Sequence, residues 1–180
     1  MKKQMFAAVT VLAACVSLPA FADERSGWYL GAGAGQVTAE EPDFGLKGTD
    51  TAFKVFGGYQ ANEYVGFELA YIDGGTPNDA IGLVYAEADI QAVQVSILPS
   101  VPLGENFSLY GRLGLLKWDA DVYLQAGNSV VAYSDDGNEF SWGAGMRISA
   151  GRFVIHAEYE QSDIDTFDYQ LISGGISFLF

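Results

Sequence analysis

The sequence predicts an all-β fold, an eight-stranded antiparallel up-and-down transmembrane β-barrel, on three observations. After the first 22 residues, the chain divides into eight runs in which large apolar side chains alternate with small or polar ones, which is the period of a β-strand. The second face of these runs consists of Gly, Ser and Ala with a few charges, whereas a strand face in water favours larger polar residues. Although 49% of the chain is hydrophobic, no later stretch approaches the roughly 20 apolar residues that a membrane helix needs.

Residues 1–22 are predicted to be a cleaved signal peptide, and residues 23–180 the outer-membrane β-barrel domain. The leader has two lysines, a short apolar run and a small-residue cleavage site that ends at Ala22. The chain has one cysteine, Cys15, which lies in this leader, so we expect neither a disulfide nor thiol chemistry in the mature protein. The stretch LAAC that ends at Cys15 also looks like a lipobox, so acylation of Cys15 stays open as an alternative.

The first three runs, residues 27–37, 51–60 and 65–72, alternate without interruption. Their apolar faces carry Trp28, Leu30, Ala32 and Ala34, then Phe53, Val55, Gly57 and Tyr59, then Val65, Phe67, Leu69 and Tyr71. Lys54 and Glu68 lie on the opposite face, so each is expected to point away from the apolar surface.

The fourth and fifth runs, residues 89–99 and 107–118, are less regular. Val93, Val95 and Ile97 share one face, but the parity around Ile90 is reversed, which predicts a β-bulge there. In the fifth run, Leu109, Leu113 and Leu115 lie opposite Tyr110 and Arg112, and the register beyond Leu116 is left open.

The last three runs are residues 139–149, 152–160 and 171–180. Their apolar faces carry Phe140, Trp142, Met146 and Ile148, then Phe153, Ile155 and Tyr159, then Ile172, Ile176, Phe178 and Phe180. Arg147, His156 and Glu158 lie on the other faces.

Alternation alone also fits a soluble sandwich or a lipocalin-like barrel, so the small-residue face decides. Gly, Ser and Ala fit a narrow lumen, where bulky residues would clash, while the apolar face meets lipid. An unpaired charge in such a lumen would cost several kcal/mol, so the charged residues should form a network. The predicted polar lumen network consists of Lys54, Glu68, Arg112, Arg147, His156 and Glu158.

The lengths of the connections predict the orientation. Short links follow the second, fourth and sixth runs, which is typical of periplasmic turns, so both chain ends should lie on the periplasmic side. The long acidic segments, residues 38–51, 74–87, 119–138 and 162–168, are predicted to be outer loops. Within the third, the strands are expected to continue around an Ala-Gly-Asn turn. Aromatic residues near the strand ends, including Tyr71, Tyr159 and Tyr169 on the outer side, are expected at the headgroup layers.

Several motifs together resemble the OmpA-like and OmpX-like eight-stranded outer-membrane barrels. They are GWYLGAGAG, FGGYQANEYVGFELAY, SLYGRLGL, WGAGMRI, IHAEYEQSDID and the terminal GGISFLF. The resemblance implies a location in the bacterial outer membrane. It also implies that the barrel-assembly machinery reads the last strand, which would assign that role to Ile176, Phe178 and Phe180. The sequence departs from the family in that no peptidoglycan-binding domain follows Phe180, so the resemblance does not imply anchoring to the cell wall.

Catalytic and metal sites are not expected. His156 is the only histidine, and the stretch His156-Ala157-Glu158 differs from the His-x-Ser stretch of lipid A deacylase, an enzyme built on a small barrel. Residues 134–139, SDDGNE, have closely spaced oxygen ligands but lack a complete calcium-loop spacing, and we interpret them as a hairpin turn. We therefore predict no enzyme activity and no cofactor.

Two functions are compatible with the sequence. The favoured one is a monomeric, non-enzymatic envelope protein that contributes to envelope integrity and displays acidic loops to lipopolysaccharide or to a host or cell-surface ligand. The alternative is a narrow channel for small solutes or ions. The net charge of −14 argues against nucleic acid as a partner. In the third loop, Leu124, Val130, Val131 and Tyr133 lie on an edge that either adds a partner strand or, as we favour, belongs to a self-paired hairpin.

Overall fold

The computed structural model describes residues 26–41, 46–76, 78–81, 84–126, 129–164 and 167–180. The predicted signal peptide and Cys15 lie outside these residues. The strands are β1 (Gly27–Glu41), β2 (Leu46–Asn62), β3 (Val65–Asp73), β4 (Asn78–Ile81), β5 (Val84–Pro102), β6 (Phe107–Ala126), β7 (Ser129–Ala150), β8 (Phe153–Ile164) and β9 (Phe167–Leu179). No described residue belongs to a helix that could cross a membrane.

Eight of these strands close into an antiparallel barrel, which confirms the predicted fold class. The order β3-β2-β1-β9-β8-β7-β6-β5 follows the chain, and pairing of β3 with β5 closes the circle. The last strand pairs with the first, for example Leu30 with Phe178. The short strand β4 pairs with residues 84–87 of β5, beyond the last pair of β3 with β5, and thus continues the position of β3 toward the other end of the barrel.

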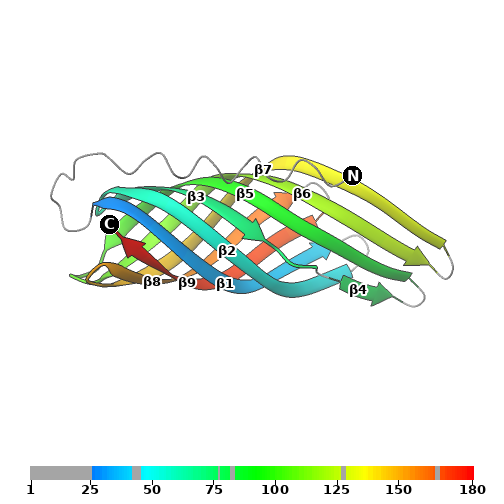
Figure 1. Cartoon of the computed structure of the whole chain (residues 1–180). Coiled ribbons are helices and arrows are strands. Elements are labelled where there is room, and N and C mark those ends of the chain that lie inside the picture. The colour runs from blue at the N-terminus through cyan, green and yellow to red at the C-terminus, as the bar shows by residue number, and fades with distance from the viewer. Residues whose placement is uncertain (1–25, 42–45, 77, 82–83, 127–128, 165–166) are drawn as a thin grey trace.

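The two ends of the barrel differ (Figure 1). One end, here called the turn end, carries the short connections after β2, β5 and β7 and the C-terminus. The opposite end, here called the hairpin end, is where β5, β6 and β7 reach farthest; these are also the longest strands, with 19, 20 and 22 residues. Gly151, with φ of 63°, supplies the left-handed conformation needed in the β7–β8 turn.

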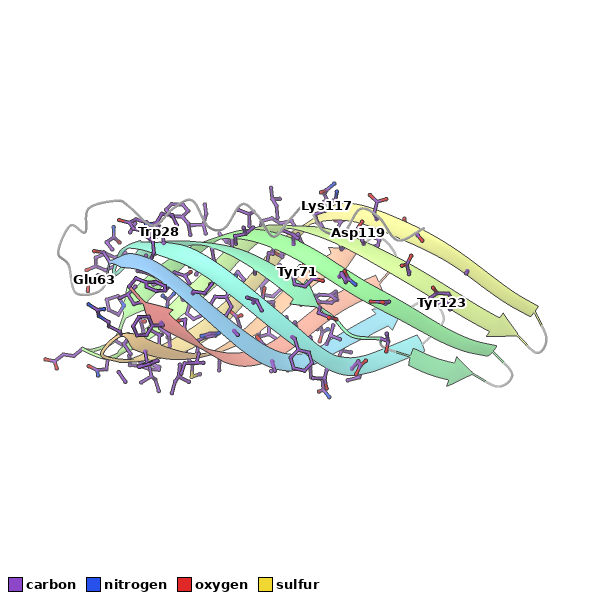
Figure 2. All side chains as sticks on the ribbon, in the orientation of Figure 1. Trp28, Glu63, Tyr71, Lys117, Asp119 and Tyr123 are labelled. Carbon is purple, nitrogen blue, oxygen red and sulfur yellow. The ribbon has the colours of Figure 1, made fainter. Side chains whose placement is uncertain are left out.

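The outward face is an apolar belt that begins near the turn end and stops before the hairpin end. Figure 2 shows Trp28 close to the turn end, Tyr71 farther along, and Lys117, Asp119 and Tyr123 successively closer to the hairpin end. Within the belt, large apolar side chains are exposed, up to 68% for Leu115. Such a surface is unfavourable in water and favourable against hydrocarbon, so the period-two patterns correctly identified the lipid face.

The glycines on the inner face make room for rings on the neighbouring strand. The direct cross-strand pairs of a ring with a glycine are Tyr29 with Gly58, Phe56 with Gly31, Tyr110 with Gly145, Trp118 with Gly137, and His156 with Gly175. A Cβ added at Gly31 would lie 2.3 Å from the ring of Phe56, and one at Gly145 would lie 2.5 Å from the ring of Tyr110. The lumen therefore needs glycine at particular register positions, and not merely small residues in general.

Three sequence expectations about local structure are wrong. The pairings of β5 continue past Ile90 without a register shift, so no bulge lies there, and Ile90 is inward because an apolar cluster fills that level of the lumen. Tyr169 is only 4% exposed and belongs to the same cluster, because the odd-numbered residues of β9 face inward. Residues 134–139 lie within β7 and form no turn, since β6 and β7 pair as far as Ala126 and Ser129.

The segments predicted to be long outer loops are largely strand. β1 and β2 extend to Glu41 and from Leu46, and β6 and β7 pair as far as Ala126 and Ser129. The expected continuation of the third loop as paired strands is confirmed. The parity of β6 is unbroken past Leu116, which places both Leu116 and Trp118 inside.

Candidate functional site

The lumen is filled in three layers along the barrel axis. The successive inward residues of β2 sample them in order: Ala52 in an apolar cluster toward the hairpin end, Lys54 in an ionic network, and Phe56 and Gln60 toward the turn end. Every second residue of a strand faces the lumen, so Ala52, Lys54 and Phe56 are consecutive inward residues, one in each layer.

The ionic network is centred on two buried cations. The Lys54 Nζ lies 2.6 Å from Glu158 Oε1 and 2.6 Å from Glu160 Oε1. The Arg112 Nη2 lies 2.8 Å from Glu68 Oε1 and 2.8 Å from Glu158 Oε2, and its Nε lies 3.5 Å from Glu160 Oε2. All five side chains are at most 4% exposed, so the two cations stabilise the three carboxylates in place of water.

Neutral side chains complete the coordination of the carboxylates. The Tyr29 hydroxyl donates to Glu68 Oε2 over 3.0 Å, and the Tyr110 hydroxyl donates to Glu158 Oε2 over 2.9 Å. Gln94 Nε2 donates to Glu160 Oε2 over 2.9 Å and to Ser141 Oγ over 2.8 Å. The network thus crosses the lumen from β1 to β8, and each carboxylate is held by donors from at least two strands.

The structure brings together four of the six predicted lumen residues: Lys54, Glu68, Arg112 and Glu158. The other two face the lumen closer to the turn end. Arg147 donates to Gln60 Oε1 over 2.9 Å and to Ser100 Oγ over 3.1 Å, and its guanidinium lies 4.4 Å from the ring centroid of Tyr110.

His156 is half-buried, with its ring edge-on to Phe56 at a centroid distance of 5.0 Å. These contacts give it a packing role in the lumen. No group of described residues has the composition of a metal site.

Sequence reasoning missed Glu160 and Gln94 as network members. Both have the correct parity, Glu160 two residues after Glu158 and Gln94 on the inner face of β5. Glu160 could have been found by continuing the inward pattern of β8 by one step. Gln94 carries no charge, so only the geometry of the barrel shows that it reaches Glu160.

An apolar cluster occludes the lumen between the ionic network and the hairpin end. It consists of Val37, Ala52, Ile72, Ile90, Ala92, Leu116, Trp118, Ala120, Tyr169 and Leu171. Val37 and Leu171 are at most 1% exposed, so water does not reach them from the barrel mouth. This layer resembles the interior of a soluble barrel, in which side chains fill the space.

Toward the turn end, the lumen is not completely filled. A cavity of about 100 Å³ lies at the mouth, and a smaller one of about 30 Å³ lies deeper, against Glu68 and Arg112. Tyr29, Arg147 and Ser177 line both. The two ends of the lumen are therefore chemically unlike, one apolar and packed, the other polar and hollow.

The hairpin end carries acidic residues on its outer surface. Asp119 pairs with Asp136 across β6 and β7, and Asp89 pairs with Asp121 across β5 and β6. Like charges directly opposite each other destabilise a sheet, so this face is not optimised for stability alone.

Asp50 holds the segment after β3 against β2. Its carboxylate accepts hydrogen bonds from the backbone N–H of Thr51 over 2.7 Å and of Thr76 over 2.8 Å. These bonds lower the pKa of Asp50 below its ordinary value. Gly75, with φ of 67°, makes the turn that brings the Thr76 amide to this carboxylate.

The sequence profile of a family described as the outer membrane protein beta-barrel domain matches residues 8–180. Outer membrane protein A of Shigella dysenteriae is 29% identical over 151 residues, which cover 77% of this chain and 40% of that protein. Outer membrane protein A of Escherichia coli O157:H7 is 30% identical over 134 residues, or 68% of this chain and 37% of that protein. The chain thus spans about two fifths of the length of these relatives.

Solved structures support the fold. Ail, the attachment invasion locus protein of Yersinia pestis, has a TM-score of 0.61 at 23% identity, covering 86% of this chain and 99% of Ail. Neisserial surface protein A has a TM-score of 0.65 at 16% identity, covering 86% of this chain and 98% of that one. With the relatives and the family profile, these likenesses place the chain in the bacterial outer membrane, where its apolar belt contacts lipid, and they confirm the OmpA-like resemblance.

Proposed function

We propose, from the premise that this chain belongs to the outer membrane protein beta-barrel domain family, that it is a non-enzymatic barrel that contributes to envelope integrity and displays an acidic sheet outside the cell. The turn end then faces the periplasm and the hairpin end faces outward, as in barrels with short periplasmic turns. The observation that most directly supports this proposal is the lumen, which the ionic network and the apolar cluster close.

The filled lumen favours a structural role over a channel. A permeating solute would have to pass both the ionic network around Lys54 and Arg112 and the apolar cluster around Trp118. Opening the first layer would separate buried ion pairs, and opening the second would displace packed side chains, each at a cost of several kcal/mol. We therefore expect no steady conductance in planar bilayers.

The acidic hairpin end supports a role in surface contact. Asp119, Asp121, Asp135 and Asp136 are exposed beyond the apolar belt. Ail has been solved with the heparin analogue sucrose octasulfate, which is a polyanion. The hairpin end of the present barrel is itself acidic, so we expect it to favour basic partners and to disfavour sulfated glycans.

The proposal can be tested in cells that lack the gene and are complemented with variants. We expect loss of the gene to increase detergent sensitivity and to weaken adhesion to polylysine-coated surfaces, with no effect on small-solute uptake. Asp119→Asn with Asp136→Asn should weaken adhesion, and the uncharged exposed change Asn138→Ala should not. Changed solute uptake with unchanged detergent sensitivity and adhesion would favour the channel.

Export and insertion are part of the same proposal. We expect residues 1–22 to be removed on export and the strand that ends in Ile176, Phe178 and Phe180 to be recognised by the barrel-assembly machinery. Phe178 packs edge-on against Phe153 and Phe180, at centroid distances of 5.2 and 5.4 Å, on the outer surface near the turn end. Replacing Phe180 by Ala should slow assembly without changing the stability of barrels that do form.

A second candidate mode of contact is strand addition at β7. Among the described residues, residues 129–140 of β7 pair with β6 alone, because pairing with β8 begins at Ser141. The opposite side of this projecting sheet is covered by β4. Replacing residues 122–133 by an Asn-Gly turn would shorten the hairpin in register, and it should abolish partner binding through this edge while leaving the barrel intact.

A further inference from the structure

The cavity at the turn end has one feature that the structural role does not require, a cation at its wall with unused hydrogen-bond donors. Arg147 lines both cavities and is half-buried. Its two hydrogen bonds go to neutral oxygens, of Gln60 and Ser100. A guanidinium has five N–H donors, so most of its donor capacity remains available.

Arg147 differs in this respect from the other lumen cations. Lys54 and Arg112 are each within ion-pair distance of at least two carboxylates. In the part of the chain that the structure describes, no carboxylate forms an ion pair with Arg147. Instead, its guanidinium makes a cation–π contact with Tyr110, with Cζ 4.4 Å from the ring centroid.

The walls around Arg147 supply both polar and apolar contacts. Ser108 is its direct cross-strand neighbour, and Ser177 lines both cavities with it. Phe107 and Leu179 give the mouth an apolar side. A guanidinium, hydroxyls and an apolar wall together suit a carboxylate with a short carbon chain.

Size and charge restrict the ligand further. A cavity of about 100 Å³ is far smaller than a typical ligand pocket but exceeds the space that a single water needs. Glu63 and Glu105 also line it, so a dianion would meet more repulsion than a monoanion.

We propose that the turn end of the lumen is a binding site for small monocarboxylate anions that enter from the periplasm, with Arg147 as the anchoring residue. The inference uses the proposed orientation only for the side of entry. The site itself depends on the cavity and Arg147, and it stands whether or not the outer sheet binds a partner.

The test is a titration of the folded ¹⁵N-labelled full chain in detergent micelles with sodium acetate, followed by NMR shifts of the Arg147 side chain and the Ser108 amide. Sodium chloride at equal ionic strength and sodium sulfate are the comparators. We expect saturable shifts with acetate, with a dissociation constant on the order of 1 mM, and weaker effects of sulfate.

Arg147→Gln should weaken acetate binding by at least about tenfold. The matched control is Arg152→Gln, at an exposed arginine in the β7–β8 turn that does not line the cavity, and it should leave the affinity within about twofold. Ser108→Leu fills the cavity and keeps the cation, so it should also abolish binding. It is the second variant to measure if Arg147→Gln does not fold. Non-saturable shifts, equal effects of chloride, or acetate binding that survives Arg147→Gln or Ser108→Leu would overturn the proposal.

Discussion

Arg112→Met is the most direct test of the ionic network. Arg112 is 2% exposed, and its guanidinium contacts Glu68, Glu158 and Glu160 at 2.8, 2.8 and 3.5 Å. Without it, three buried carboxylates share Lys54 as the one cation of the network. Removing one partner of a buried ion pair costs about 3–5 kcal/mol, because the other charge stays buried and unpaired, so we expect a loss of that size.

The measurement is equilibrium unfolding in urea of the barrel in lipid vesicles, with folded protein detected by its heat-modifiable migration on gels. Arg152→Met is the matched control, at an exposed turn position, and should change the free energy of unfolding by less than about 0.5 kcal/mol. Adding Glu68→Leu to Arg112→Met should recover part of the loss, because it removes a carboxylate that has lost its cation. A loss below about 1 kcal/mol for Arg112→Met would refute the idea that the network is dry and tightly paired.

Three further predictions concern the other layers. Gly31→Ala should cost about 1–3 kcal/mol in the same unfolding assay, because its Cβ would lie 2.3 Å from the ring of Phe56. Gly174→Ala, with its nearest contact at 3.6 Å, should cost less than about 1 kcal/mol. Equal effects would contradict the idea that glycine at position 31 makes room for that ring. Trp118→Ala should cost about 3–5 kcal/mol through the cavity that it leaves in the apolar cluster, and a small loss would show that this layer is loosely packed. The pKa of Asp50 is lowered in the fold, so its stabilising contribution should be present above its unfolded pKa of about 3.9 and be lost as pH falls through the folded value. The protection factor of the Thr76 amide, which is its exchange rate relative to the intrinsic rate at the same pH, should therefore fall on acidification. Asp50→Asn should remove most of this pH dependence, and an unchanged dependence would exclude Asp50 as its source.

Much of the barrel follows from local information. The lipid face could be predicted because each strand alternates with period two, and a single residue such as Leu115 reveals its face from its two neighbours. The members of the ionic network with obvious charge, such as Arg112 and Glu158, could be assigned to the lumen by the same parity. Parity says nothing about depth, so it could not show that Arg147 faces the lumen outside the network while Arg112 lies within it.

The sequence by itself determined the fold class, the strand faces and the presence of a buried set of charges, because these depend on the identity of residues within one strand. Only the tertiary structure decided which charges meet, where the apolar cluster closes the lumen, and how far β6 and β7 project beyond the belt. Those features depend on the register between strands, since the tilt and closure of the barrel determine which residues of β2, β6 and β8 reach the same level.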